Sequence, residues 1–545
     1  APGMTARARV APALAVTALS LAVATLAPGQ SGAGEGRGGK SKPPPNVVVV
    51  MSDDQTVESL RVMPKLDRLL ADEGITFTNA FAANPVCCPS RATFLTGQYS
   101  HNNGVLRNAP PNGGHVALDD SETLAVWLQR AGYFTAHIGT YLNGYGQADP
   151  LEIPRGWDDW HGAIHPTHSR MYGYTLNENG TLVTYGDFEV EDPAAYQTDV
   201  YATKAAEVIA ARAPSRKPFF LTVAPLAPHG ETTPDDPETE PLEPNNPRPA
   251  PRHAGAFADE PHPRPASFDE ADVSDKPAEI RARAPLSAGD EAAMGDRYRA
   301  RLASLLALDE LVETIVGELG AARELNRTLI VFTTDNGFLL GEHRLRATKA
   351  FPYEESIRVP LIVRGPGLPR GTRRHQPVVN ADLAPTILHY ARGEAGVRAD
   401  GRSLHRLIAD KHLEPGRAVL IENWCQPNES CFDPQVPRYA GVRTARYLYA
   451  EHAAGDVELY DLERDPFELE SRHADPAYAS ERAALDRLLG RLAGCAGRSC
   501  AAKPRLDLKL DYRRGEIGGR RCALSAVVAK VRGRDREEAL EAAFR

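Results

Sequence analysis

The chain has 545 residues, of which 42% are hydrophobic and 25% are charged. This length is sufficient for one large domain and a smaller one. The formal net charge of -9 at pH 7 argues against a general nucleic-acid-binding or heparin-coating surface. An anionic substrate would therefore have to be attracted by a local group of cationic side chains.

The N-terminal region has the composition of an export signal. Arg7 and Arg9 precede an uncharged run rich in Ala, Val and Leu over residues 10–27, which is typical of a cleaved signal peptide. The alternative is a membrane anchor, but the run is mostly alanine and at the short limit for a spanning helix. We predict a signal peptide over 1–27, a linker over 28–45, and a secreted protein without stable membrane insertion.

The first core element is predicted at residues 46–51, where a β-branched run favours a buried central strand. It leads into Asp53 and Asp54, and the carboxyl ends of strands are where α/β sheets bind ligands. Two adjacent carboxylates repel each other, and a divalent cation would relieve that repulsion. The alternative is a solvated acidic turn.

Helices and strands alternate along the next 340 residues or so, which favours an α/β fold. The predicted helices cover 64–74, 121–132, 195–211 and 293–319, with a further helix starting near 380–387, and the predicted strands cover 75–81, 134–138, 218–223, 329–334 and 359–363. The Pro-rich stretch 231–290 lacks periodicity and reads as a surface excursion, either a substrate-shaping rim or a tolerated insertion.

The segment that follows the strand over 75–81 begins Pro85-Val86-Cys87-Cys88-Pro89-Ser90-Arg91 and reaches Gly97. Pro89 suits a first helical turn, and Gly97 suits a helix end. Cys87 would then lie where free backbone N–H groups favour an anion, with the Arg91 cation nearby. The alternative is a buried cysteine pair or half of a disulfide, although adjacent cysteines rarely bridge each other and the spacing does not match a C-x-x-C zinc site.

A second pair of oxygen ligands follows the predicted strand over 329–334. Asp335 and Asn336 stand there as Asp53 and Asp54 stand after the first strand. Strand ends that are far apart in sequence can meet at one sheet edge. Carboxylate and amide oxygens suit Ca²⁺, so the four residues are candidates for one calcium site.

Beyond about residue 416 the pattern changes to extended segments, which indicates a smaller C-terminal subdomain. The segments cover 418–422, 439–449 and 458–462, and a helix is predicted over 481–492. The seven cysteines fit an exported protein with local disulfides. Cys425 with Cys431 and Cys495 with Cys500 are close enough to form small loops, which leaves Cys522 unpaired. We assign no function to the basic stretch 504–545.

The Cys87 segment resembles the type I sulfatases, in which the first cysteine of C-x-P-S-R is oxidised by a separate enzyme to formylglycine (3-oxoalanine). The resemblance covers five separated blocks between about Asn46 and Cys500. It is closest to N-acetylglucosamine-6-sulfatases, through the Cys-Cys-Pro-Ser-Arg motif, a Tyr-Leu-Asn-x-Tyr-Gly loop and Leu-Tyr-Asp-Leu followed by a cysteine pair. It implies an alkaline-phosphatase-like large mixed β-sheet flanked by helices over 46–415, and a smaller antiparallel sheet with a helix over 416–503.

The resemblance also implies roles for individual residues. The expected catalytic residues are Cys87, which is also the modified residue, Arg91, His229 and Lys349. The expected Ca²⁺ ligands are Asp53, Asp54, Cys87, Asp335 and Asn336. Thr140 stands where similar loops carry a sulfate-binding lysine, so it is a substrate-binding candidate, and His137 is a candidate to compensate for that change. His343 is a further candidate for the pocket lining.

The activity that the resemblance implies is hydrolysis of a sulfate monoester, with a sulfated sugar as substrate and a formylglycine-generating enzyme as maturation partner. The hydrated aldehyde at residue 87 would attack sulfur after Asp335 accepts its proton, and Lys349 or His229 would protonate the departing alcohol. Three alternatives stay open: a phosphodiester or phosphonate monoester hydrolase of the same fold, a weakly catalytic glycan-binding relative because of Thr140, and a thiol-redox protein.

Overall fold

The computed structural model describes residues 43–215, 217–234, 245–413, 416–425, 436 and 438–501. The predicted signal peptide, nearly all of the linker and the basic C-terminal stretch lie outside this range. Among the described residues, none of the helices has both the length and the apolar character that a membrane crossing requires.

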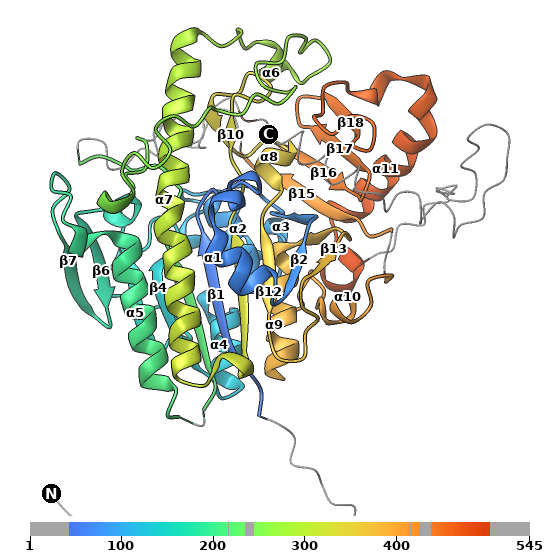
Figure 1. The fold of residues 1–545 in the computed structure, drawn as a ribbon. Coiled ribbons are helices and arrows are strands. Elements are labelled where there is room, and N and C mark those ends of the chain that lie inside the picture. Colours follow the sequence, from blue (N-terminus) through green and yellow to red (C-terminus); the bar gives the residue numbers. More distant parts are fainter. Residues whose placement is uncertain are drawn as a thin grey trace, which may run out of the picture. The chain divides into compact units, whose positions relative to one another are not determined.

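The core is a ten-stranded mixed sheet (Figure 1). Its strands, in spatial order, are β13 (Thr372–Arg374), β2 (Ile75–Phe77), β12 (Leu361–Arg364), β9 (Thr328–Thr334), β1 (Asn46–Ser52), β8 (Phe219–Ala224), β4 (Phe134–Thr140), β5 (Asp159–Ala163), β6 (Tyr174–Glu178) and β7 (Thr181–Tyr185). The central strand β1 runs parallel to both β8 and β9. Antiparallel pairs occur toward both edges.

Alternate residues of β1 pack against different helices, because successive side chains of a strand point to opposite faces. Val47 and Val49 belong to the cluster formed with α2 (Cys87–Thr96), α4 (Leu124–Arg130) and α9 (Leu383–Ala391). Val48 and Val50 belong to the cluster formed with α1 (Pro64–Leu66), α5 (Gln197–Arg212) and α7 (Ala288–Ala321). Helices therefore cover both faces, which explains why β1 is apolar along its whole length.

The long helix α7 exceeds the predicted 293–319 at both ends. Ser287 accepts the backbone N–H of Asp290, and the Asp290 carboxylate accepts the backbone N–H of Ser287. This reciprocal capping fixes the start of the helix and the end of the Pro-rich excursion. Within the described part of that excursion, the regular elements are α6 (Ala278–Arg281) and one short 3₁₀ turn.

The C-terminal part forms a separate antiparallel sheet with one main helix, as predicted. Its strands are β15 (Val419–Asn423), β16 (Tyr439–Arg443), β17 (Tyr447–His452) and β18 (Val457–Asp461), and its helix is α11 (Ala479–Leu492). The predicted Cys495–Cys500 disulfide is present, with an S–S distance of 2.05 Å. Cys431 and Cys522 lie outside the described residues, so the other cysteine predictions are not tested.

Two local predictions differ from the structure. The strand predicted over 75–81 is divided into β2, which joins the large sheet, and β3 (Ala80–Phe81), which pairs with β14 (Val378–Val379). The turn at Thr78–Asn79 divides them, with the Asn79 side chain donating to the His375 carbonyl at 2.7 Å. The sequence analysis also missed β5, β6 and β7 at the edge of the sheet.

Candidate active site

The parallel pairing of β1 with β9 brings the two acidic strand ends together. The register runs to Ser52 opposite Thr334, so the residues that follow each strand are neighbours. The backbone N–H of Asp54 donates to Oδ1 of Asp335 at 3.0 Å, and the Asn336 amide donates to Oδ1 of Asp54 at 2.5 Å. Asp53, Asp54, Asp335 and Asn336 are all buried. The structure brings these four residues together, and their role as metal ligands stays a prediction.

Helix α2 presents Cys87 at its first turn, after the extended residue Val86. Sγ of Cys87 lies 3.6 Å from Oδ1 of Asp53. The helix is anchored by Ser90, whose hydroxyl donates to the Asp335 carbonyl and accepts from the Asn380 amide at 2.8 Å. Cys87 is thereby fixed against the acidic strand ends.

Two buried cations neutralise part of the acidic group. Arg91 donates to Oδ2 of Asp335 at 2.9 Å, to Oδ2 of Asp53 at 3.0 Å and to the Thr140 carbonyl at 2.7 Å. Lys349 follows β11 (Ala347–Thr348), and its ammonium lies 2.6 Å from Oδ1 of Asp54. The arginine therefore bridges both strand ends, while the lysine contacts one of them.

The electrostatics follow from burial and from the close carboxylates. Burial, together with Asp335 and Asp54, raises the pKa of Asp53 to about 7. Burial also acts to raise the pKa of Asp54, but the charges of Lys349 and its other cationic neighbours outweigh burial and lower that pKa. Burial, with the carboxylates around it, raises the pKa of the Cys87 thiol well above its ordinary value. A neutral thiol is a poor nucleophile, which argues against the thiol-redox alternative.

His229 faces the same centre from the turn after β8. Its Nδ1 donates to the Gly230 carbonyl at 2.7 Å, and its Nε2 lies 3.5 Å from Oδ2 of Asp54. The sequence analysis missed Arg301 of α7, which donates to the carbonyls of Pro228 at 3.1 Å and of Asp54. The signal in the sequence that could have revealed Arg301 is the presence of a charged residue on the apolar face of a predicted helix.

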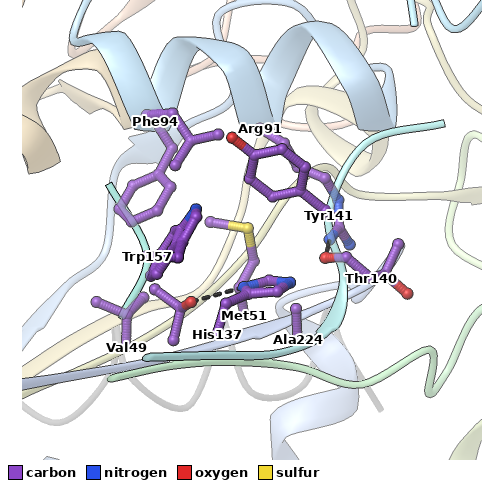
Figure 2. A pocket seen from close by; sticks show the side chains of 11 residues that line it. Val49, Met51, Arg91, Phe94, His137, Thr140, Tyr141, Trp157 and Ala224 are labelled. Carbon is purple, nitrogen blue, oxygen red and sulfur yellow. Dashed lines mark hydrogen bonds between the residues drawn. The ribbon is translucent and has the colours of Figure 1, made fainter. Parts of the chain in front are cut away.

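Thr140 ends β4 next to Arg91, and both residues line a cavity (Figure 2). Its backbone carbonyl accepts from Arg91, and its hydroxyl oxygen is buried with no hydrogen-bond partner in the described part of the chain. The hydroxyl therefore lacks the internal contact that the carbonyl has.

His137 lines the same cavity but is held by internal contacts (Figure 2). Its Nδ1 lies 2.7 Å from the Thr222 hydroxyl, its Nε2 lies 3.1 Å from the Gly139 carbonyl, and its ring stacks on Trp160. Burial lowers its pKa to about 3. A neutral histidine cannot supply the charge of a lysine, so the structure does not support its predicted compensation for Thr140.

His343 is not brought to this centre. It is completely buried, its Nδ1 lies 2.6 Å from Oε2 of Glu270, and its ring stacks on Tyr353. His343 also belongs to a second group of titratable side chains, together with Glu355 and Glu468. We therefore exclude His343 from the substrate pocket, contrary to the sequence prediction.

Several residues of the centre have the geometry to hold a metal ion. One ligand atom from each of Asp53, Asp54, Cys87 and His229 lies within 4.8 Å of the others. Together with the mixed α/β sheet and its small C-terminal antiparallel sheet, this centre defines a hydrolase of the alkaline-phosphatase-like class.

The family model described as Sulfatase matches residues 45–393, and the model described as N-sulphoglucosamine sulphohydrolase, C-terminal, matches residues 341–494. The chain belongs to the sulfatase family, as its motifs predicted.

Individual relatives agree with this assignment. The chain is 34% identical to the "Putative extracellular sulfatase Sulf-1 homolog" of Caenorhabditis elegans over 70% of its length, and it spans only 51% of that relative. It is 30% identical to the human N-acetylglucosamine-6-sulfatase, covering 84% of this chain and 86% of the relative. A solved structure "in complex with its substrate D-Glucosamine-2-N, 6-O-disulfate" superposes with a TM-score of 0.68 at 26% identity, covering 85% of this chain and 99% of the other.

Proposed function

We propose that this protein hydrolyses sulfate monoesters of a sulfated sugar similar to N-acetylglucosamine 6-sulfate. The observation that carries the proposal is the position of Cys87, 2.7 Å from the Lys349 ammonium and 3.6 Å from Asp53. The names of the relatives support the substrate class, because one is an N-acetylglucosamine-6-sulfatase and one solved structure holds a 6-O-sulfated glucosamine.

We propose Ca²⁺ as the metal, bound by Asp53, Asp54, Asp335, Asn336 and the modified side chain of residue 87. The donor set fits a hard cation, because oxygen atoms from two strand ends gather in a buried place. Oδ1 of Asn336 is buried with no partner in the described chain, while the amide nitrogen donates to Asp54. A half-turn of this amide would direct its oxygen, instead of its nitrogen, toward Asp54. The Asn336 oxygen and the Asp54 carboxylate could then bind the same cation. Bound Ca²⁺ would screen the negative charge of a sulfate ester.

We propose that Cys87 is converted to formylglycine, whose hydrate would supply an oxygen nucleophile that the neutral thiol does not. Arg91 orients both strand ends and places positive charge beside them. In this proposal Asp335 would accept a proton from the hydrate, and Lys349 or His229 would give one to the departing alcohol. Proton transfer and charge stabilisation both require side chains that are held in fixed positions. The buried ion pairs of Arg91 and Lys349 with the aspartates hold these side chains in place.

We also propose that the protein is secreted and is matured by a separate enzyme. A signal peptide over 1–27 would export the protein, and a formylglycine-generating enzyme would be its maturation partner. One relative is named an extracellular sulfatase, which supports a secreted protein.

The test is mass spectrometry of the Cys87 peptide combined with kinetics on N-acetylglucosamine 6-sulfate and on an aryl phosphonate. We expect an aldehyde at residue 87 and a higher kcat/KM for the sulfate. Cys87→Ala should abolish turnover. The matched Cys88→Ala protein should keep it, since Cys88 is the adjacent residue and is absent from the group of ligand atoms. An intact thiol in active protein, or a preference for phosphorus, would contradict the proposal.

A further inference from the structure

A second group of acidic side chains lies outside the catalytic centre. One ligand atom from each of His343, Glu355 and Glu468 lies within 4.8 Å of the other two. His343 is 0% exposed and Glu468 is 1% exposed. The three residues come from separate segments, namely the loop after β10 (Leu339–Leu340), helix α8 (Glu354–Ile357) and the stretch after β18.

The orientation of His343 is set by Glu270. Nδ1 of His343 lies 2.6 Å from Oε2 of Glu270, whose other oxygen lies 3.0 Å from the Lys276 ammonium. An ionised carboxylate only accepts hydrogen bonds, so Nδ1 carries the hydrogen and Nε2 keeps its lone pair. A carboxylate that holds one N–H of an imidazole, leaving the other nitrogen for a metal, recurs at metal sites.

Each of the three residues offers one acceptor atom without a donor. Nε2 of His343, Oε2 of Glu355 and Oε1 of Glu468 are buried, and they have no hydrogen-bond partner among the described residues. The other oxygens of the two glutamates are held in place. Glu355 accepts from the Ser267 hydroxyl at 3.5 Å, and Glu468 accepts from the Glu354 backbone N–H at 3.0 Å. Buried acceptors without donors are costly, and a cation shared by all three would offset that cost.

The nearby cationic side chains are already paired with other carboxylates. Lys276 contacts Glu270 and Asp275. Arg443 binds Glu354, with its Nε 2.7 Å from Oε1 and its Nη2 3.2 Å from Oε2. Within the described part of the chain, neither Glu355 nor Glu468 has an ion pair with a basic side chain. The negative charge of this group is therefore balanced either by protons on the carboxylates or by a bound cation.

We propose that His343, Glu355 and Glu468 form a binding site for one Zn²⁺ ion, separate from the proposed Ca²⁺ centre. An imidazole nitrogen with carboxylate oxygens is a ligand set of zinc, whereas Ca²⁺ takes oxygen ligands. Three protein ligands leave a coordination position for water.

A cation in this site would connect the active-site loop to the C-terminal sheet. His343 and Lys349 flank β11, so the ion would hold the loop that carries the catalytic lysine candidate. Glu468 extends from the segment that follows β18. The site therefore has a structural role, and it does not depend on the proposed substrate.

The test uses the whole protein in millimolar Ca²⁺, which fills any oxygen-ligand site, followed by equilibrium dialysis against micromolar Zn²⁺ and elemental analysis. We expect about one Zn²⁺ per chain and an increase in Tm. His343→Gln and Glu468→Gln should each lose this Zn²⁺. Glu470→Gln changes a side chain that is 66% exposed two residues away, and it should keep the ion. Circular dichroism checks that the variants are folded.

A second probe reports the imidazole ligand directly. Co²⁺ in place of Zn²⁺ should give visible absorption that shifts or disappears in His343→Gln. Absence of Zn²⁺ binding by the wild-type protein would overturn the proposal, as would equal binding by folded His343→Gln and Glu468→Gln proteins. The wild-type measurement decides the question even if a variant fails to fold.

Discussion

The ammonium nitrogen of Lys349 lies 2.7 Å from the sulfur of Cys87. The same ammonium is fully buried and contacts Asp54 at 2.6 Å. In the proposed reaction it would lie beside both the nucleophile and the departing oxygen. Lys349→Met should therefore lower kcat/KM for a sulfate ester by about a hundredfold to a thousandfold, measured by steady-state kinetics. The exposed Lys411 provides the control, since Lys411→Met should leave kinetics unchanged. Wild-type activity in Lys349→Met would exclude this role.

Replacing Thr140 with Val should raise the stability of the protein and lower its activity. The hydroxyl oxygen of Thr140 is buried without a partner in the described chain. Thr140→Val replaces this unsatisfied hydroxyl with a methyl group and keeps the shape of the side chain. Substrate-free protein should become more stable by about 1 kcal/mol, seen as a higher Tm. If the hydroxyl binds substrate, kcat/KM should fall about tenfold, roughly the loss of one neutral hydrogen bond. Thr140→Ser, which keeps the hydroxyl, is the matched control. Unchanged kinetics in Thr140→Val would remove Thr140 from the substrate site.

Arg301 is predicted to be a positioning residue. It holds the Asp54 carbonyl and the Pro228 carbonyl, which precedes His229. Arg301→Met would leave two buried acceptors unpaired, with a loss of stability of about 3 kcal/mol. Assayed well below its Tm, this variant should show reduced kcat with a smaller change in KM. Arg301→Lys should restore part of kcat, because one donor can still reach. A loss of stability with normal kcat would show that the role is only structural.

His101 predicts a pH dependence of stability. Its Nδ1 lies 2.8 Å from Oε2 of Glu422 and its Nε2 lies 2.9 Å from the Cys495 carbonyl, so both nitrogens face acceptors. Burial acts to lower the pKa of His101, but these acceptors outweigh burial and raise it above 6.5.

The stabilisation from His101 should be complete below pH 6.5 and should be lost as pH rises through the folded-state pKa. Thermal unfolding between pH 5.5 and 8.5 should show this loss, and His101→Gln should reduce the slope. The same slope in both proteins would contradict the assignment.

The sequence predicted the central architecture because its signals are local. The β-branched run of β1 and the acidic pair after it stand side by side in the chain, as do β9 and Asp335. The family resemblance then aligned the two strand ends, which the structure joins through the Ser52–Thr334 register.

Other features depend on tertiary contacts that no local pattern reveals. Strand β5, which lies between β4 and β6, carries Trp160 and His161 without clear alternation, so its pairing with β4 gives no strong signal. His343 resembles a pocket residue in sequence, yet its position depends on Glu270, from the irregular excursion. Similarly, Arg301 is recognisable as functional only once Pro228 and Asp54 are known to lie beside it.

The in-register pairing of β1 with β9 also constrains the order of events during biosynthesis. β1 emerges early, but it finds its two neighbours only after β8 and β9 have been made, and such long-range contacts form slowly. Every residue of α2 is enclosed in the finished protein. The proposed oxidation of Cys87 by a separate enzyme would therefore have to take place before the late strands close the sheet.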